Sequence, residues 1–234
     1  MSPFAAILQV LFPTTCACCG EVLVHGERQV CLNCLCDMAA TAFSSMDDNP
    51  VERKLAGLRR LRHATAVYLF RKGSTVREVV HAMKFRGNTE LCLMMGRQMG
   101  LDLLASGRFD DVDVLVPVPL HWLRRLWRGY NQSELLCRGI GEVLKAPVCT
   151  DAVMRHRYTR QQSLQQGQQR TDNVADAFRL RKASKIEGKH VLLVDDVITT
   201  GATLSACANA IAEADGVSIS VAAFSMALER YFLM

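Results

Sequence analysis

Short, continuous apolar runs along the chain predict the strands of a buried sheet. Residues 191–194 read Val-Leu-Leu-Val, and residues 114–118 read Val-Leu-Val-Pro-Val. A third run of strand type covers residues 64–71. Uninterrupted apolar runs are typical of parallel strands that are covered on both faces. The pattern therefore predicts an α/β fold with a mainly parallel sheet flanked by helices.

Between these runs, the apolar residues recur at helical spacing. The spacing predicts a helix over residues 76–85, and Gly87 ends it. Residues 91–104 continue as an apolar helix, and a further helix is expected to begin after Gly201. The residues that set the first helical pattern are Val76, Val79, Val80 and Met83.

Other stretches break these patterns and suggest the domain boundaries. Residues 1–12 are apolar and are expected to form a short helix that packs on the protein, with a weak interfacial helix as the alternative. We expect a helix and a small cysteine-rich unit over residues 1–38, a helix-rich linker over 39–62, and the main domain over 63–234. Residues 155–178 are polar, rich in Gln and basic, which is typical of a disordered segment or of a mobile lid over a ligand.

Composition places the chain among globular proteins with one sizeable core. It has 234 residues, of which 50% are apolar, and a net charge of +5. This charge permits anionic ligands without demanding nucleic acid. No run is long enough to span a membrane, and the apolar start lacks the features of a signal peptide. With ten cysteines and no secretory signal, a reducing, cytoplasmic location is expected.

Two Cys-x-x-Cys pairs lie near the start of the chain. Cys16 and Cys19 form the first pair, and Cys31 and Cys34 the second. Four thiolates at this spacing are typical of a closed, tetrahedral Zn²⁺ site, which is structural and not catalytic. The metal would stabilise a small element that has little core of its own.

Three neighbouring residues leave alternatives for this zinc site. Cys18 and Cys36 could each serve as a ligand in a shifted register, and His25 could replace a thiolate. Free reactive thiols are the alternative for the whole cluster. The remaining cysteines are interpreted as small core residues: Cys92, Cys137, Cys149 and Cys207.

The residues after the 191–194 strand suit a phosphorylated sugar. Asp195 and Asp196 follow the strand, and a loop of small and hydroxylated residues leads into a helix. Gly201 allows close backbone approach, and the free N–H groups of a helix start favour an anion. The acids can accept hydrogen bonds from sugar hydroxyls or face Mg²⁺. The loop consists of Thr199, Thr200, Gly201, Ala202 and Thr203.

A basic stretch follows the 114–118 strand. It is interpreted as a loop that could bind pyrophosphate through Arg124, Arg125 and Arg128. A solvated basic face is the alternative. Trp122 and Trp127 interleave with the arginines, and packing of their rings is favoured over stacking on bases.

These motifs together resemble the ComF family of bacteria, and the acidic loop resembles the phosphoribosyl pyrophosphate (PRPP) loop of type I phosphoribosyltransferases. The resemblance covers nearly the whole chain. It is carried by the paired Cys-x-x-Cys start, Lys84-Phe85-Arg86-Gly87, the Pro-Val-Pro strand, Arg128-Gly129-Tyr130-Asn131-Gln132, the pattern Gln162, Arg170, Asn173-Val174, Ala177-Phe178, and Asp195-Asp196-Val197-Ile198-Thr199-Thr200-Gly201.

The resemblance implies a zinc finger followed by a phosphoribosyltransferase-like domain linked to DNA uptake in natural transformation. Asp195 and Asp196 would be catalytic residues that hold the ribose hydroxyls, and residues 199–203 would bind the 5′-phosphate. The loop after Pro119 would face the pyrophosphate with Mg²⁺, and Arg128 would belong to the PRPP site. Arg170 could close on the pyrophosphate.

The function that follows is PRPP binding with Mg²⁺, with phosphoribosyl transfer to an acceptor as the reaction. The alternative is a non-catalytic zinc-ribbon adaptor that binds single-stranded DNA or protein partners, such as other competence proteins. Release of pyrophosphate would select the first, and a strong salt dependence of DNA binding would support the second. A regulator that has lost catalysis is the third hypothesis.

Overall fold

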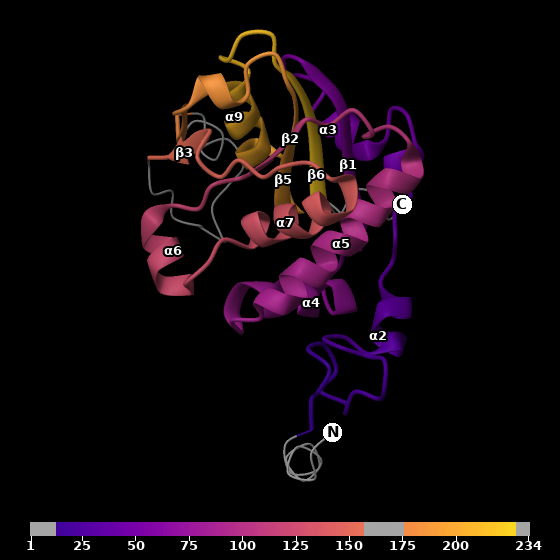
Figure 1. Ribbon diagram of the computed structural model, residues 1–234. Coiled ribbons are helices and arrows are strands. Elements are labelled where there is room, and N and C mark those ends of the chain that lie inside the picture. Colours follow the sequence, from indigo (N-terminus) through magenta and orange to yellow (C-terminus); the bar gives the residue numbers. More distant parts are fainter. Residues whose placement is uncertain (1–12, 157–175, 228–234) are drawn as a thin grey trace.

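The computed structural model describes residues 13–156 and 176–227, and its main sheet has four strands, all parallel (Figure 1). The spatial order is β1-β6-β5-β2. Pairing is in parallel register throughout, with Leu192 of β5 opposite Leu115 of β2. This confirms the predicted fold class. The strands are β1 (Leu61–Phe70), β2 (Val114–Pro117), β5 (His190–Ile198) and β6 (Ser218–Ala227).

Helices lie on both faces of this sheet. Successive residues of β5 alternate between two apolar clusters: Val191 and Leu193 pack toward one, Leu192 and Val194 toward the other. This is why the strand is an uninterrupted apolar run. In Figure 1, α5 and α7 cross the face nearest the viewer. The main helices are α4 (Thr75–Phe85), α5 (Thr89–Ser106), α7 (Gln132–Leu144) and α9 (Ala202–Ile211).

The helices predicted from spacing are confirmed. Two of them begin after a side chain that caps the helix: Ser74 accepts a hydrogen bond from a backbone N–H of α4, and Asn88 does so for α5. The helix α9 begins after Gly201 instead. The helix α4 buries Val76, Val79 and Met83, as its periodicity indicates. The four cysteines assigned to the core are buried as well.

Close contact between α5 and α7 fixes the position of α7. Gly96 of α5 and Gly139 of α7 face each other so closely that an added Cβ at either would collide with the backbone of the other helix. Small residues at such a crossing let two helix backbones approach. The first turn of α7 then lies next to the carboxyl end of β5, where Ser133 contacts Asp195.

Residues 39–62 contain short helical turns that pack on the sheet. They are η1 (Phe43–Ser45) and α3 (Pro50–Lys54). The fully buried Asn49 caps α3 through its carbonyl oxygen and donates from Nδ2 to the Ala64 carbonyl of β1 at 2.8 Å. Val51 and Leu55 join the apolar cluster shared with α9.

Smaller elements complete the fold. The two-stranded antiparallel pair of β3 (Val153–Arg155) and β4 (Phe178–Leu180) brings Arg155 opposite Phe178. The remaining elements are η2 (Ala183–Lys185), α6 (Trp122–Arg128) and α2 (Leu32–Asp37). Figure 1 shows α2 and the preceding cysteine-containing residues below α4, away from the sheet.

Candidate functional site

Two adjacent carboxylates lie in the last part of β5, and each has a defined partner. Oδ1 of Asp195 accepts hydrogen bonds from the Ser133 hydroxyl at 3.0 Å and from the Asp196 backbone N–H at 2.9 Å. Oδ2 of Asp196 lies 3.0 Å from the Lys84 ammonium. The partners come from the starts and ends of other elements: Ser133 from the first turn of α7, and Lys84 from the last turn of α4.

Asp195 is held in an environment that disfavours its charge. Burial, and then repulsion from the neighbouring Asp196 carboxylate, raise the pKa of Asp195 to about 7, against the opposing effects of Lys84 and Ser133. A strongly raised carboxyl pKa in a cavity is a common property of functional sites.

The threonine-rich loop has the conformation that the sequence predicts. Gly201 has φ +83° and is the residue before α9, which begins at Ala202. A Cβ added at Gly201 would lie 3.1 Å from Cδ2 of Leu55, so glycine is favoured both by the backbone angle and by the contact with Leu55. Thr199 and Thr200 are exposed at the carboxyl end of β5.

A cavity of about 480 Å³ opens at the carboxyl ends of β2 and β5. Asp195, Asp196, Thr199 and Thr203 line it, whereas Thr200, Gly201 and Ala202 form the turn beside it. The cavity is rich in positive charge. Its basic residues are Arg77, Lys84, Arg124, Arg128 and Arg155, and they outnumber the two acids.

Arg128 reaches this cavity from the end of α6. Its Nη1 donates to Oε1 of Gln132 at 2.7 Å, and its guanidinium lies 5.3 Å from the centre of the Phe85 ring. Its Nε is buried without a hydrogen-bond partner among the described residues. Burial lowers the pKa of Arg128, while the Asp196 charge acts in the opposite direction. The predicted site residue thus lies in the cavity with an unused donor.

The basic stretch after β2 is a helix, so the prediction of a loop is wrong. The His121 side chain accepts from the Leu123 N–H at 3.3 Å and caps α6, and Gly129 at φ +82° ends it. The seven intervening residues are all compatible with a helix.

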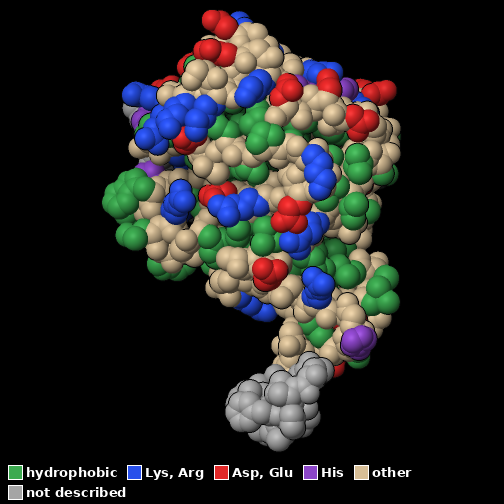
Figure 2. All heavy atoms as spheres, viewed as in Figure 1, with side chains coloured by type: hydrophobic (Ala, Val, Ile, Leu, Met, Phe, Trp, Pro, Cys, Tyr) green, Lys and Arg blue, Asp and Glu red, His purple; other side chains and the backbone are tan. Residues whose placement is uncertain are grey.

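The predicted packing of the tryptophan rings is only partial: Trp127 makes an edge contact with Phe85, with 6.3 Å between ring centroids, and Trp122 lies 5.7 Å from the His121 ring. Trp122 is 63% and Trp127 76% exposed, and Figure 2 shows hydrophobic side chains gathered over α6. The helix α6 buries none of its residues, so the spacing of its apolar residues does not correspond to a face packed on the core.

Arg170 and most of the predicted lid lie outside the described residues. The ends of that stretch are described: Arg155 closes β3 and Phe178 opens β4. Arg155 lines the cavity, and its guanidinium lies 5.3 Å from the Phe178 ring centre. The predicted helix over residues 1–12 likewise lies outside the described residues.

Several cavity residues were not singled out as site residues from the sequence. They are Arg77, Lys84, Ser133 and Arg155. One signal was present: Arg77, His81 and Lys84 are spaced as one helix face, next to the core face of the same helix. For Ser133 no local pattern existed, because its role depends on where α7 begins relative to β5.

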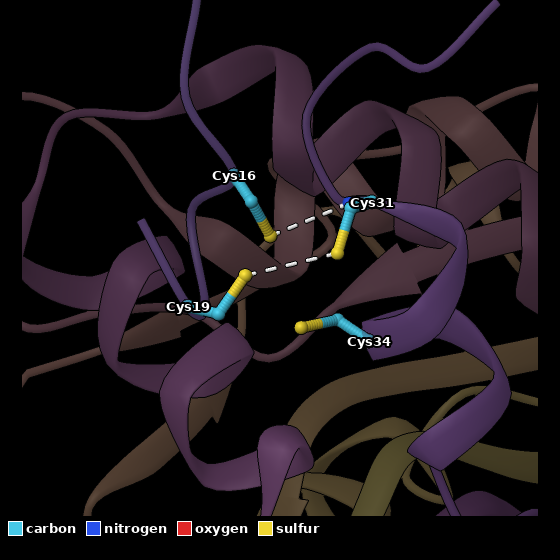
Figure 3. A group of neighbouring side chains, drawn as sticks. All are labelled: Cys16, Cys19, Cys31 and Cys34. Carbon is cyan, nitrogen blue, oxygen red and sulfur yellow. Dashed lines mark hydrogen bonds between the residues drawn. The ribbon is translucent and has the colours of Figure 1, made fainter. Parts of the chain in front are cut away.

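The four predicted metal ligands converge at the start of the chain. The Sγ atoms of Cys16, Cys19, Cys31 and Cys34 all lie within 4.8 Å of one another, and the side chains point toward a common centre (Figure 3). A tetrahedron of thiolates around Zn²⁺, with Zn–S of about 2.3 Å, has sulfur–sulfur edges of about 3.8 Å. The cluster is therefore consistent with a zinc ribbon. Within the described residues, Cys18, Cys36 and His25 are not part of it.

Within the cluster, Cys16 is the thiol whose thiolate is favoured, whereas burial raises the pKa of Cys34. Burial raises the pKa of the Cys16 thiol, but backbone N–H donors, including those of Cys31 and Cys18 at 3.3 and 3.4 Å, outweigh burial and lower it to about 6. Burial and the Cys16 charge raise the pKa of Cys18 to about 12, which disfavours its thiolate.

Two hydrogen bonds connect residues 16–34, here called the cysteine module, to the residues that follow α4. Nη1 of Arg86 donates to the Ala17 carbonyl at 2.9 Å, and Nδ2 of Asn88 donates to Oε1 of Gln29 at 2.7 Å. Arg86 is two residues after Lys84 and directly follows α4. The same turn of chain thus contacts the module and carries a cavity residue.

Comparison with known proteins identifies the main domain. The family model described as "Phosphoribosyl transferase domain" matches residues 135–231, which include the acidic pair and the threonine loop. The chain is similar to bacterial proteins named for DNA utilization and for competence. It is 37% identical over 131 residues to the DNA utilization protein YhgH of Escherichia coli (strain K12), covering 54% of this chain and 56% of that protein. The match thus spans little more than half of this relative's length.

Competence protein ComFC of Bacillus subtilis (strain 168) is 28% identical to this chain over 168 residues, covering 71% of the chain and 64% of that protein. Among solved structures, a glutamine PRPP amidotransferase from B. subtilis complexed with ADP and GMP matches with 19% identity and a TM-score of 0.36. That match covers 56% of this chain and 25% of the other. None of the helices in the described part of the chain is long and apolar enough to span a membrane.

Proposed function

We propose that the cavity binds PRPP together with Mg²⁺, and that this ComF-like chain transfers the phosphoribosyl group to an acceptor. One observation carries the proposal. Two adjacent carboxylates face a cavity lined by five basic side chains, beside the first turn of a helix. A ribose with phosphates at both ends has the same distribution of groups, because its hydroxyls can donate to carboxylates and its phosphates attract cations.

The proposed roles follow the positions of the residues. Asp195 and Asp196 accept hydrogen bonds from the ribose 2′ and 3′ hydroxyls. The backbone and hydroxyl groups of residues 199–203 bind the 5′-phosphate, with help from the N–H groups at the start of α9. Arg128, whose Nε has no hydrogen-bond partner among the described residues, donates to the pyrophosphate. Arg170 is proposed as a second donor to the pyrophosphate.

The cavity suits Mg²⁺ that is bound mainly through a ligand. Mg²⁺ prefers oxygen ligands and is commonly held by one or two carboxylates together with substrate phosphates and waters. The cavity offers Asp195 and Asp196 for this purpose. When bound, the ion would supply charge neutralisation at the pyrophosphate.

The proposed reaction is a displacement at ribose C1. The bond between C1 and the pyrophosphate oxygen breaks, the electron pair leaves with pyrophosphate, and an acceptor atom forms the new bond to C1. Arg128 and the other cavity cations stabilise the departing charge. Asp195 and Asp196 hold the ribose and stabilise positive charge that develops on the ring. The acceptor supplies the nucleophile.

The cysteine cluster is proposed to hold one structural Zn²⁺. Its four thiols leave no open position for a substrate, and the surrounding module has few buried apolar residues of its own. The ion would therefore hold residues 16–34 in place beside α4.

A second function, binding of single-stranded DNA or a protein partner, is supported by α6. Its exposed Trp122 and Trp127 lie on either side of Arg124 and Arg125 in the sequence. Aromatic rings beside arginines suit unpaired bases. The names of the relatives, which refer to DNA utilization and competence, agree with a role in DNA uptake. Binding of an oligonucleotide that weakens steeply with salt, and is lost in Trp122→Ala/Trp127→Ala, would support this function.

Thermal stability with and without Mg²⁺ and PRPP tests the main proposal. A ligand present at 100 times its Kd stabilises the folded state by about 2.7 kcal/mol. We expect saturable stabilisation of the wild type and none in Asp195→Asn/Asp196→Asn. Failure of saturating PRPP to stabilise the wild type would contradict the proposal. Release of pyrophosphate in the presence of candidate acceptors then tests transfer itself.

A further inference from the structure

One face of α4 forms a wall of the cavity. Arg77, Val80, His81, Lys84 and Phe85 all line the cavity, and their spacing of three and four residues places them on a single side of the helix. A helix with one face along a charged cavity can supply side chains that contact a ligand, in addition to packing against the core.

This wall lies across the sheet from the threonine loop. The buried residues of α4 pack in one apolar cluster, on one face of the sheet, and those of α9 pack in the other cluster, on the opposite face. The cavity reaches residues of both helices, with Asp195 and Asp196 between them at the end of β5. A ligand that places one phosphate at the start of α9 therefore extends over the acidic pair toward α4.

Lys84 is the α4 residue that contacts the acidic pair. Its Nζ lies 3.0 Å from Oδ2 of Asp196, and the two side chains are 23% and 12% exposed. Both line the cavity, so a ligand can reach either partner. Arg128 lies close enough to Asp196 to interact with its charge, which leaves two cations beside one carboxylate. Positive charge is in excess at this end of the cavity.

We propose that Lys84 binds the pyrophosphate end of the ligand, exchanging its contact with Asp196 for a contact with a phosphate oxygen. The inference rests on the proposed function and assigns it a further ligand-binding residue. In the empty protein, Lys84 neutralises Asp196 and keeps it aligned. When ribose hydroxyls donate to Asp196, the ammonium is free to turn to the phosphates, where its charge is more strongly attracted.

Three ligands separate this role from a purely structural ion pair. The variant Lys84→Met removes the charge but keeps most of the side-chain length, and Lys189→Met makes the same charge change at the opposite end of β5, away from the cavity. Calorimetric titration of wild type and variants with PRPP, pyrophosphate and ribose 5-phosphate, each with Mg²⁺, measures the affinities.

We expect Lys84→Met to weaken PRPP and pyrophosphate by about tenfold to hundredfold, as for loss of a charge-assisted hydrogen bond. Ribose 5-phosphate, which lacks pyrophosphate, should bind within about threefold of wild type, and Lys84→Arg should restore most of the affinity for PRPP. Lys189→Met should match wild type for all three ligands. Circular dichroism confirms that each variant is folded.

Two results would overturn the inference while leaving the proposed function intact. One is unchanged PRPP affinity in Lys84→Met. The other is equal weakening of PRPP and ribose 5-phosphate, which would mean that Lys84 acts only by holding Asp196. If wild type binds none of the three ligands, the proposed function itself fails, and that result is visible before any variant is made.

Discussion

The Ser133 hydroxyl donates to Oδ1 of Asp195 at 3.0 Å, joining the first turn of α7 to the end of β5. The serine is 3% exposed, and the close packing of α5 on α7 fixes its position. Asp195 is therefore oriented by a helix that follows a different strand. The geometry of the acidic pair depends on the packing of the whole sheet and not only on the loop that follows it.

Removing this hydroxyl should weaken ligand binding without unfolding the protein. In Ser133→Ala, Asp195 keeps the Asp196 N–H but loses its second donor. The loss of one hydrogen bond to a carboxylate predicts about three- to tenfold weaker binding of PRPP with Mg²⁺. Calorimetric titration measures it, with the exposed Ser184→Ala as control. Equal affinities in the two variants would show that Ser133 does not orient Asp195.

The pH dependence of stability should reveal the strained charge of Asp195. Its folded-state pKa of about 7 lies above the usual value of 3.8, so the native state binds more protons than the unfolded state between these pH values. The resulting destabilisation is absent below pH 4, grows as pH rises, and is complete above pH 7. Asp195→Asn should therefore raise the free energy of unfolding at pH 8 by ~1–2 kcal/mol, and by nearly nothing at pH 4.

Urea denaturation of wild type and Asp195→Asn at both pH values makes this comparison. The same variant should lose PRPP binding, so stability and function would change in opposite directions. If Asp195→Asn were less stable than wild type at pH 8, the proposed destabilisation by the Asp195 charge would be contradicted.

Pairs of cysteine substitutions should separate metal ligands from bystanders. The variant Cys19→Ser/Cys34→Ser removes two members of the four-sulfur cluster and should no longer retain zinc. The matched variant Cys18→Ser/Cys36→Ser removes two thiols from the same module and should retain one zinc per chain. Metal analysis after dialysis against a weak chelator measures the difference. Zinc loss in the second variant would mean that the ligand set is different.

Gly201 should be more sensitive to substitution than another glycine of the same backbone conformation. Gly201→Ala places an alanine at φ +83° and brings its Cβ into contact with Leu55. Gly73→Ala places an alanine at a similar φ of +80°, but its Cβ meets no atom within 4 Å. Both should lose about 1 kcal/mol of stability from the backbone angle. Only Gly201→Ala should also weaken PRPP binding, because the start of α9 must shift. Thermal unfolding with and without ligand tests both parts.

The fold class, the helices α4, α5 and α9, and the cluster of four cysteines could be predicted because each depends on local sequence, whereas β6 and α7 were not predicted. Apolar runs predict β2 and β5, and the helical spacing of apolar residues predicts α4. The two Cys-x-x-Cys pairs have the spacing that is typical of a four-cysteine metal site. The Asp195–Thr203 loop was also informative by itself.

The remainder of the site depends on contacts between distant segments. Lys84 and Ser133 reach the acidic pair only because α4 and α7 end and begin at the edge of the sheet. Trp127 is 76% exposed although its ring makes an edge contact with the Phe85 ring, and a local pattern of aromatic residues cannot reveal this exposure.

The hydrogen bond from Arg86 to Ala17 has a thermodynamic consequence. Arg86 directly follows α4, and Lys84 is in the last turn of that helix, so we expect metal binding by the cysteine module to favour the position of Lys84 in which it contacts the proposed ligand. If zinc raises the affinity for PRPP by some factor, PRPP must raise the affinity for zinc by the same factor. Chains saturated with PRPP should then retain zinc at a higher chelator concentration than empty chains, and Arg86→Ala should reduce the difference, because the hydrogen bond from Asn88 to Gln29 remains.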